Sequence, residues 1–269
     1  GGSGQNPARQ AAMLSELPHN TSALTVNQVC GSGLRSISIA TQSILANQSD
    51  VIIAGGQESM SNAHHTMNLR NGIKMGDGKL KDSMIIYGLW CAMNNYHMGT
   101  TAENIAENFN ISKKEQDEFA TLSQNKAEKA QKNSHFKNEI LPIEVKNKKD
   151  KITFNEDEFP RHGTTFEKIN QLKPVFNKDG TVTAGNASGL NDGAAAVMIM
   201  TEKKAQELDL KPIVKIISSS TVGVDPAIMG IGPVPAVKKA LKLANWKLED
   251  IDLIEANEAF AAQSLAVSR

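Results

Sequence analysis

The apolar residues of the N-terminal part follow two different periods, which predict strands and helices in alternation. Short apolar runs at Ser22–Asn27 and Val51–Ala54 are typical of buried strands, whereas apolar residues recur at helical spacing from Leu34 to about Gln48. A further helix is expected near Ala8–Ser15. A strand, a helix and a strand in this order predict a parallel βαβ unit.

The same alternation of strand and helix patterns is found again near the C-terminus. Strands are expected at Ala195–Met200, Pro212–Ile217 and Ile251–Glu255, and helices at Glu202–Leu208 and Val234–Ala244. The alternation predicts an α/β fold with a layered core.

The middle region, about 61–189, has little strand pattern and is rich in Lys, Asn, Met and His. Helices are expected at Thr101–Phe109 and Ser112–Ser134. The second begins with a capping box, because its first serine is followed three residues later by Glu115. The lysine-rich stretch Lys146–Lys151 is expected to be a solvated loop. This texture predicts an inserted domain with irregular connections.

Composition narrows the classes of function. The 269 residues include 29 basic and 29 acidic side chains, and aromatic residues make up 4%, so neither a nucleic-acid partner nor an anionic membrane is expected. No apolar run is long enough to span a bilayer, and no signal-like segment is visible near the N-terminus. With two cysteines, these features predict a cytoplasmic protein in which a disulfide between Cys30 and Cys91 is disfavoured.

Cys30 lies between Gly31 and the strand predicted before it, at the start of the predicted helix. Free backbone N–H groups and the positive end of the helix dipole favour a thiolate at such an elbow. Gly31 and Gly33 leave room for an approaching substrate and permit positive φ. A nucleophile is therefore one interpretation of Cys30, and a buried structural cysteine is the other.

Several short segments together carry a family resemblance that none carries alone. They are Gly4–Gln10, Asn27–Leu34, Ala54–Ser61, Lys74–Asp77, Tyr96–Asn104, Gly185–Ala194 and Asn257–Ala262. In this order and spacing they resemble the thiolases, most closely the biosynthetic acetyl-CoA acetyltransferases. The resemblance extends from Gly4 to the end of the chain.

The resemblance implies a fold of two similar βαβαβαββ halves, in layers α/β/α/β/α, with a loop domain inserted in the first half. On this chain it implies four parts. The N-terminal core occupies 1–60 and 190–211, the inserted loop domain 61–189, and an incomplete C-terminal core 212–269. We therefore expect the chain to be a piece of a longer protein, truncated at both ends.

The implied reaction is the reversible Claisen condensation of two acetyl-CoA molecules to acetoacetyl-CoA and CoA. Cys30 matches the family nucleophile that carries the acetyl group. Asn257 matches the asparagine that holds an oxyanion-hole water; the other interpretation is a helix N-cap, and one amide can serve in both roles. His97 matches a histidine that lines the acyl pocket, although a lone histidine is more often structural. Met98 matches the side chain that keeps this pocket short.

The resemblance also implies contacts for coenzyme A, which is a substrate here, so no cofactor and no metal are expected. Arg161 matches a contact at the nucleotide end and Ser188 a contact to the pantetheine. The run Gly185–Gly189 lacks the Lys-Ser/Thr ending of a phosphate loop and is expected to be a tight turn near the ligand. Asn68–Lys81 matches the loop through which family dimers pair, which implies a homotetramer. The apolar tunnel wall is implied at Leu89, Phe176, Ala184, Ala259 and Phe260.

Two family motifs do not occur in these 269 residues. They are a Gly-His-Pro motif, whose histidine activates the nucleophile, and a Cys-x-Gly-Gly-Gly motif, whose cysteine moves the α-proton. Cys91 lacks that glycine context and is expected to be incidental. The chain alone is therefore expected to be a poor catalyst. Two other interpretations stay open: a related condensing enzyme with another acyl donor, and a non-catalytic CoA-binding or scaffold protein.

Overall fold

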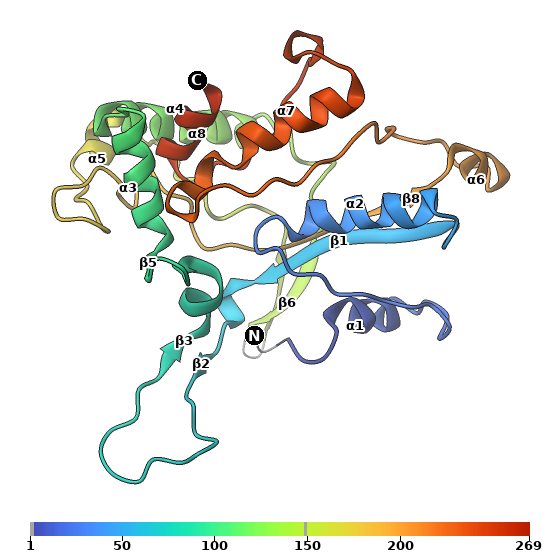
Figure 1. The fold of residues 1–269 in the computed structure, drawn as a ribbon, viewed down its shortest axis with the longest axis horizontal. Helices are drawn as coiled ribbons and strands as arrows, with labels where there is room; N and C mark the ends of the chain where they lie inside the picture. Colours follow the sequence, from blue (N-terminus) through green and yellow to red (C-terminus); the bar gives the residue numbers. More distant parts are fainter. Residues whose placement is uncertain (1–2, 148–149) are drawn as a thin grey trace. The chain divides into compact units, whose positions relative to one another are not determined.

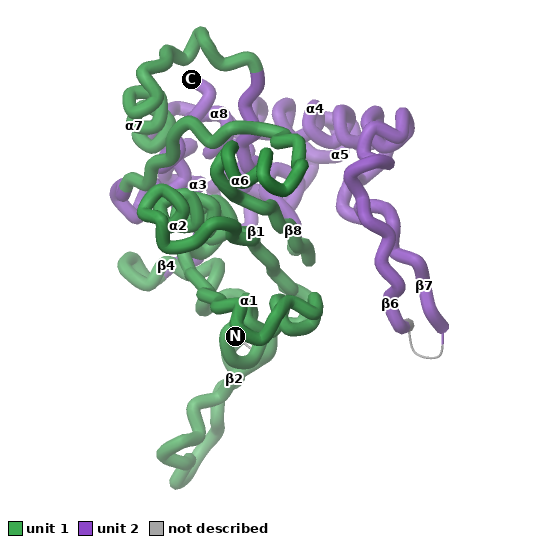
Figure 2. Tube along the Cα trace, turned by 90° about the vertical axis from the view of Figure 1, so that its right-hand side faces the viewer, with its two compact units in different colours: residues 1–95, 190–222, 235–252 green, residues 96–189, 223–234, 253–269 purple. Residues whose placement is uncertain are grey.

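The computed structural model describes residues 3–147 and 150–269. The chain forms two compact units, each built from several stretches of sequence (Figure 2). Unit 1 comprises residues 1–95, 190–222 and 235–252, and unit 2 comprises residues 96–189, 223–234 and 253–269. These units group residues by contact, so the four-part division expected from the sequence stays a prediction.

Unit 1 is organised around a two-stranded antiparallel sheet. Strand β1 (Val51–Ser59) pairs with β8 (Asp192–Met200) along its whole length, from Val51 opposite Met200 to Ser59 opposite Asp192. Helix α2 (Ser32–Leu45) lies along this sheet (Figure 1). The core between them is apolar because both elements turn their small and branched residues inward. It contains Ala40, Ile44, Ala54 and Ile199, with Ile37 and Ile52 beside them.

The N-terminal helix α1 (Pro7–Leu14) confirms the helix expected there. The buried strand predicted at Ser22–Asn27 is wrong, because this segment has no strand assignment and is largely exposed. It is tied to α1 by side chains instead. The Asn6 amide donates to the Ala23 carbonyl oxygen at 3.1 Å, and the Thr25 hydroxyl accepts from the Ala8 N–H at 3.2 Å.

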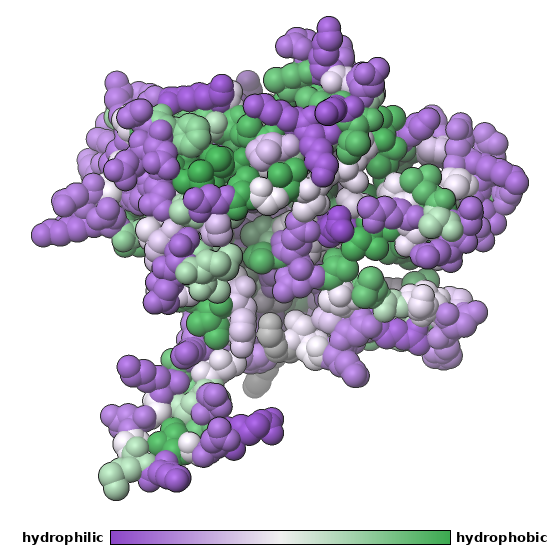
Figure 3. Space-filling model, in the orientation of Figure 1, coloured by the Kyte–Doolittle hydropathy of each residue, from purple (hydrophilic) through white to green (hydrophobic). Residues whose placement is uncertain are grey.

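A projecting loop connects β2 (His65–Thr66) to β3 (Lys81–Asp82), which pair antiparallel (Figure 1). The loop carries both hydrophilic and hydrophobic residues in the space-filling view (Figure 3), and Met75 is 94% exposed. The rest of unit 1 contains η1 (Met60–Asn62), η2 (Ile85–Leu89), β4 (Trp90–Cys91), α6 (Glu202–Glu207), most of α7 (Pro233–Ala244) and η4 (Leu248–Asp250).

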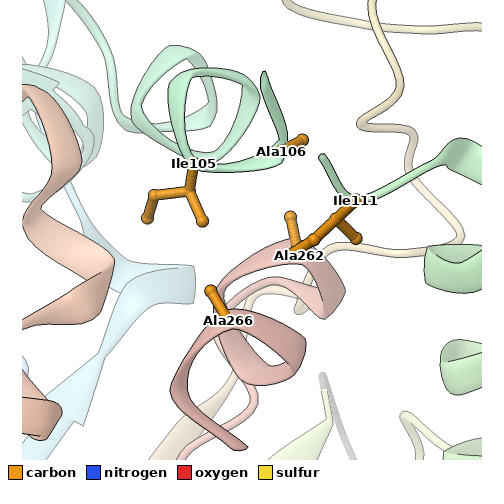
Figure 4. Packing of buried hydrophobic residues seen from close by; sticks show 5 residues of the cluster. All are labelled: Ile105, Ala106, Ile111, Ala262 and Ala266. Atoms are coloured by element: carbon orange, nitrogen blue, oxygen red, sulfur yellow. The ribbon is translucent and has the colours of Figure 1, made fainter. Parts of the chain in front are cut away.

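Unit 2 is mainly helical. Helix α3 (Met98–Asn108) packs against α8 (Ala261–Ser268) and η3 (Pro226–Ile231). Figure 4 shows small and branched side chains of α3 and α8 pointing toward one another, together with Ile111 just after α3. Alanines at the contact let the two helices approach closely. The buried cluster is Ile105, Ala106, Ile111, Ala262 and Ala266.

The remaining elements of unit 2 are β5 (Tyr96–His97), α4 (Lys113–Lys132), α5 (Phe166–Asn170) and a hairpin of β6 (Ile143–Asn147) and β7 (Asp150–Phe154). The hairpin projects from the helices (Figure 2). It corrects the solvated loop expected at Lys146–Lys151, of which residues 148 and 149 lie outside the described part. The alternating apolar residues of the two strands were the signal for the hairpin.

The strands expected at Pro212–Ile217 and Ile251–Glu255 are also wrong. Both segments are irregular and largely exposed, and within the described residues neither pairs with another strand. The parallel βαβ unit is likewise not formed, since β1 pairs antiparallel with β8. A segment with an apolar run forms a strand only if another segment supplies its hydrogen-bond partners. Among the described residues, no helix combines the length and the apolar composition that crossing a bilayer requires.

The capping box of α4 is confirmed. The Ser112 hydroxyl accepts from the Glu115 N–H at 3.3 Å, while the Glu115 carboxylate accepts from the Ser112 N–H at 2.7 Å. Hydrogen bonds from the Ser112 side chain and backbone, and one from Arg269, lower the pKa of Glu115 from its ordinary value of 4.5 to about 2. The helix start therefore depends on an ionised Glu115.

We expect Glu115→Gln to destabilise the protein near neutral pH but to flatten its loss of stability in acid. Because the pKa of Glu115 is lower in the folded state, its contribution is complete above pH 4.5 and is lost as pH falls toward 2. Thermal melts of parent and variant between pH 7 and pH 2 measure this difference. Glu118→Gln, on the same helix, is the control, since Glu118 only forms an exposed pair with Lys114. Parallel pH curves for parent and Glu115→Gln would contradict the prediction.

Candidate active site

Cys30 lies in unit 1, exposed, one residue before the N-cap Gly31 of α2. The turn that carries it is closed by hydrogen bonds on both sides. The Gly31 N–H donates to the Gln28 carbonyl oxygen at 3.0 Å, and the Ser32 N–H donates to the Val29 carbonyl oxygen at 3.1 Å. The Ser32 hydroxyl also donates to Val29 and accepts from the Gln28 N–H. The thiol is thus held at the first turn of a helix and open to solvent.

Val29 has a φ of 49°, which is the left-handed region that a β-branched residue rarely adopts. Such a conformation costs on the order of 1–3 kcal/mol and persists only where neighbours enforce it. Here the Asn27 carboxamide oxygen accepts from the Val29 N–H at 3.0 Å, and Ser32 binds the Val29 carbonyl. The strained residue directly precedes Cys30 and turns the chain sharply into α2.

Gly33 has a packing role that the sequence did not predict. It lies against Gly56 of β1, where an added Cβ on Gly56 would be 3.3 Å from the Gly33 Cα. The Ser36 hydroxyl donates to the Gly55 carbonyl oxygen at 2.9 Å at the same contact. The missing side chains therefore let the first turn of α2 approach β1, and this contact fixes the position of the helix that carries Cys30.

His97 lies in unit 2 and is the N-cap of α3, where its Nδ1 accepts from the Gly99 N–H at 3.0 Å. A ring nitrogen that accepts carries no proton, so the neutral ring holds its proton on Nε2. Burial lowers the pKa of His97, which favours this neutral form. The Nε2–H group is therefore available as a hydrogen-bond donor.

Three rings of unit 2 form a row. Phe176 stacks on His97 with centroids 4.6 Å apart and an interplanar angle of 20°, and Phe260 meets Phe176 edge-on at 6.5 Å. Gly99 makes the stacking possible, since a Cβ at that position would be 2.2 Å from the Phe176 ring. The structure thus brings together His97, Phe176 and Phe260, which the sequence proposed separately.

The turn after Ala184 pairs with the segment that precedes α8. Ser188 N–H donates to the Ala259 carbonyl oxygen at 3.0 Å, and Ala261 N–H donates to the Asn186 carbonyl oxygen at 2.9 Å. The second bond also explains where α8 begins. Its N-cap is Phe260, in extended conformation, because the backbone just before the helix is engaged in this pairing.

Asn257 is therefore not the N-cap of the last helix, and that interpretation is wrong. It lies exposed, four residues before the first residue of α8. Its neighbour Glu258 accepts a hydrogen bond from the Ser123 hydroxyl of α4 at 2.6 Å. The oxyanion-hole role of Asn257 stays a prediction.

Glu103 of α3 is a site residue that the sequence did not reveal. Its carboxylate accepts from the N–H groups of Thr181 and Val182, each at 2.8–2.9 Å, and from the Thr181 hydroxyl at 2.9 Å. It anchors the segment that follows Phe176 to the helix that begins after His97. Only its place within the Tyr96–Asn104 segment hinted at this.

The other predicted residues are placed as follows. Arg161 is exposed, and its N–H donates to the Gln124 side-chain oxygen at 2.8 Å. Ala184 and Ser188 are exposed, and Met98 is half-buried at the first residue of α3. Leu89 is half-buried at the end of η2, in unit 1. Of the set, Cys30 and Leu89 belong to unit 1 and the rest to unit 2.

The second cysteine and the side chains that could bind a metal complete the description of the site. Cys91 is buried, and its Sγ accepts from the Asn94 N–H at 3.4 Å. Within the described part of the chain, no group of three or more His, Cys, Asp and Glu side chains is placed to hold a metal ion.

Comparison with known proteins shows which family the sequence and the fold of this chain match. The family model described as "Thiolase, N-terminal domain" matches residues 1–203, and "Thiolase, C-terminal domain" matches residues 210–269. The acetyl-CoA acetyltransferase of Allochromatium vinosum is 55% identical over 100% of this chain and 68% of its own length. The enzyme of that name from Pseudomonas aeruginosa is 56% identical, over 100% of this chain and 69% of its own.

Solved structures agree with the family models. An acetyl-CoA acetyltransferase from Syntrophomonas wolfei matches with a TM-score of 0.96 at 44% identity, over 99% of this chain and 67% of that one. Human mitochondrial 3-ketoacyl-CoA thiolase in complex with CoA matches with a TM-score of 0.94 at 44% identity, over 100% and 67%. The thiolase-like α/β fold expected from the sequence is confirmed.

Proposed function

Because the chain belongs to the thiolase family, we propose that it is an acyltransferase of the acetyl-CoA acetyltransferase type. Its reaction is the reversible condensation of two acetyl-CoA molecules to acetoacetyl-CoA and CoA. The observation that carries this proposal is the exposed Cys30 on a strained turn at the start of α2. Relatives about 55% identical over the whole chain bear the name of this activity.

Cys30 performs the covalent step. Its thiolate attacks the thioester carbonyl of acetyl-CoA, the carbon–sulfur bond to CoA breaks, and CoA leaves as a thiolate that takes up a proton. A second acetyl-CoA then loses an α-proton to the cysteine base of the family's Cys-x-Gly-Gly-Gly motif, which does not occur in these 269 residues, and its enolate carbon attacks the acetyl group on Cys30. The product is acetoacetyl-CoA, and the Cys30 thiolate is released. The covalent intermediate divides one difficult acyl transfer into two steps of similar energy.

The residues of unit 2 serve substrate binding and charge stabilisation. Asn257 holds a water that donates to the thioester enolate oxygen, which is an electrostatic role. His97 presents its Nε2–H to the acyl pocket. Ser188 contacts the pantetheine, and Arg161 contacts the nucleotide. Phe176, Ala184, Ala259 and Phe260 supply the apolar tunnel wall in unit 2, and Leu89 supplies apolar surface in unit 1.

The experiment that tests this function is intact-mass measurement after incubation with acetyl-CoA, followed by peptide mapping. One acetyl group on Cys30, and none on Cys91, supports the acyl-enzyme. Measured CoA binding without acetylation would favour the alternative, a non-catalytic CoA-binding or scaffold protein. Because the family's Gly-His-Pro and Cys-x-Gly-Gly-Gly motifs do not occur in these 269 residues, a result with neither CoA binding nor acetylation is repeated on a chain that carries both motifs, where the same result would overturn both functions.

We expect Met98→Ala to widen the range of accepted acyl chains. Met98 is half-buried directly beside His97, so removing its long side chain deepens the pocket that His97 lines. The rate of Cys30 acylation by butyryl-CoA relative to acetyl-CoA should rise by about tenfold, which corresponds to about one to two methylenes accommodated. Met93→Ala is the control, because Met93 is 73% exposed in unit 1. An unchanged chain-length preference in Met98→Ala would remove Met98 from the pocket.

The assembly and location are proposed on the same basis. The loop between β2 and β3 exposes Leu69, Met75 and Leu80, which suits the family's pairing of dimers into a homotetramer. Coenzyme A thioesters are substrates, so the reaction needs no separate cofactor. A cytoplasmic location, without nucleic acid or membrane as partner, fits the balanced charge.

A further inference from the structure

We propose that Asp117 is a positioning residue that acts through Asn186 on the wall of the substrate site. Neither residue was among the expected site residues. The proposal rests on the proposed function, because Ser188, Ala259 and Phe260 form a substrate wall only if the chain binds a CoA thioester. Asp117 itself contacts no substrate in this scheme.

Asp117 is a fully buried carboxylate on α4. Its Oδ2 pairs with the Lys113 Nζ at 2.6 Å, and its Oδ1 accepts from the Asn186 Nδ2 at 2.9 Å. Lys113 is held in turn, since its Nζ donates to the Asn170 carbonyl oxygen at 3.0 Å. A buried charge is retained only where it is paired and hydrogen-bonded, and here both carboxylate oxygens are engaged.

The Asn186 side chain is 3% exposed and uses its whole amide. Its Nδ2 donates to Asp117 and to the Thr181 carbonyl oxygen at 3.0 Å, while its Oδ1 accepts from the Thr183 N–H at 2.8 Å. An ionised carboxylate can only accept hydrogen bonds. Asp117 therefore requires that the Nδ2 group of Asn186 face α4. The Oδ1 atom is then left to accept the hydrogen bond from the Thr183 N–H in the turn.

The orientation of the Asn186 amide affects the residues that form the wall of the substrate site, because the backbone around Asn186 is bonded to them. The backbone carbonyl oxygen of the same Asn186 accepts from Ala261 N–H, and Ser188 N–H, two residues on, donates to Ala259. Phe260 lies between these two bonded residues and meets Phe176 edge-on. A change at Asp117 should therefore loosen Ser188 and Phe260 together, while the Cys30 turn, in unit 1, keeps its own hydrogen bonds.

Hydrogen exchange tests the positioning directly and needs no ligand. In Asp117→Asn, the amides of Ser188 and Ala261 should exchange about tenfold faster or more, as expected when a hydrogen bond to a charged group is weakened. Glu118→Gln makes the same chemical change one residue along on an exposed side chain and should leave both amides unchanged. Ile111→Val, in the unit 2 core, controls for a general loss of stability and should not single out these two amides.

Affinity for CoA, measured by calorimetry, links the positioning to function. We expect Asp117→Asn to bind CoA about tenfold more weakly than Glu118→Gln does. If Asp117→Asn does not fold, Asn186→Ala serves, since it keeps the pair of Asp117 with Lys113 and removes the link to Asp117 together with the side-chain bonds to Thr181 and Thr183. Unchanged exchange at Ser188 and Ala261 in the folded variant overturns the proposal. If the parent chain binds no CoA, the proposed function fails, and faster exchange in the variant still supports the positioning.

Discussion

Cys30→Ser should lose acetylation by acetyl-CoA almost completely, by about a thousandfold or more in rate. The substitution exchanges a thiolate for a hydroxyl group that is scarcely ionised at neutral pH, so it removes the nucleophile itself. Loss of a nucleophile is among the largest effects that a single substitution has on an enzyme. The measurement is the rate at which the intact mass gains one acetyl group.

The fold should survive this change, because Cys30 is exposed and its side chain takes no part in the bonds that close its turn. Thermal melts of Cys30→Ser and the parent should therefore coincide. Cys91→Ser is the matched control. Cys91 is buried, and the serine oxygen can still accept from the Asn94 N–H, so labelling should persist. Equal labelling of Cys30→Ser and parent would refute the nucleophile assignment.

The elements that could be predicted from the sequence are those whose determinants are local. The capping box at Ser112 and Glu115 marks the start of α4, and helical spacing after Leu34 marks α2. The Cys30 turn was also expected, because glycines beside a cysteine between an apolar run and a helix are a local signal. The strain at Val29 could not be foreseen, since valine disfavours that conformation.

The features that escaped prediction depend on residues far apart in sequence. Pro212–Ile217 has the composition of a strand, yet no described segment supplies its hydrogen bonds. The start of α8 is set by the bond from Ala261 to Asn186, 75 positions away, and not by Asn257. Glu103 and Asp117 were invisible for a related reason. Carboxylates on an amphipathic helix are usually solvated, and only the tertiary structure reveals that Asp117 is buried and that Glu103 binds the backbone of a distant segment.

Gly99→Ala is expected to reduce both the stability of the protein and its affinity for CoA, because Gly99 contacts the aromatic row of His97, Phe176 and Phe260. Considered as a helix residue, alanine at this position should stabilise α3, because alanine is favoured over glycine in a helix by about 1 kcal/mol. The contact with Phe176 opposes this. The added Cβ would be 2.2 Å from the Phe176 ring, and real carbon atoms do not approach so closely. Overpacking of this kind costs about 1–3 kcal/mol, so the clash outweighs the gain.

The ring must therefore move, and its position determines two contacts at once. Phe176 stacks on His97 and meets Phe260, so its displacement disrupts the pocket that both residues line. We expect affinity for CoA to fall by about tenfold to a hundredfold, measured by calorimetry, with a lower melting temperature. Gly223→Ala is the control, because Gly223 also lies in unit 2 and a Cβ there meets nothing within 4 Å.

A double variant distinguishes the effect of Gly99→Ala on the Phe176 ring from its effect on the stability of α3. In Gly99→Ala combined with Phe176→Leu, the smaller side chain relieves the clash, so the melting temperature should recover toward that of Phe176→Leu alone. The affinity of the double variant for CoA should stay low, because the aromatic stack on His97 is absent both in it and in Phe176→Leu. Full affinity in Gly99→Ala would mean that α3 tolerates the extra carbon by a small shift and that the Phe176 stack does not control binding. Weak binding with recovered stability in the double variant would show that the Phe176 stack is required for CoA binding, independently of its effect on the fold.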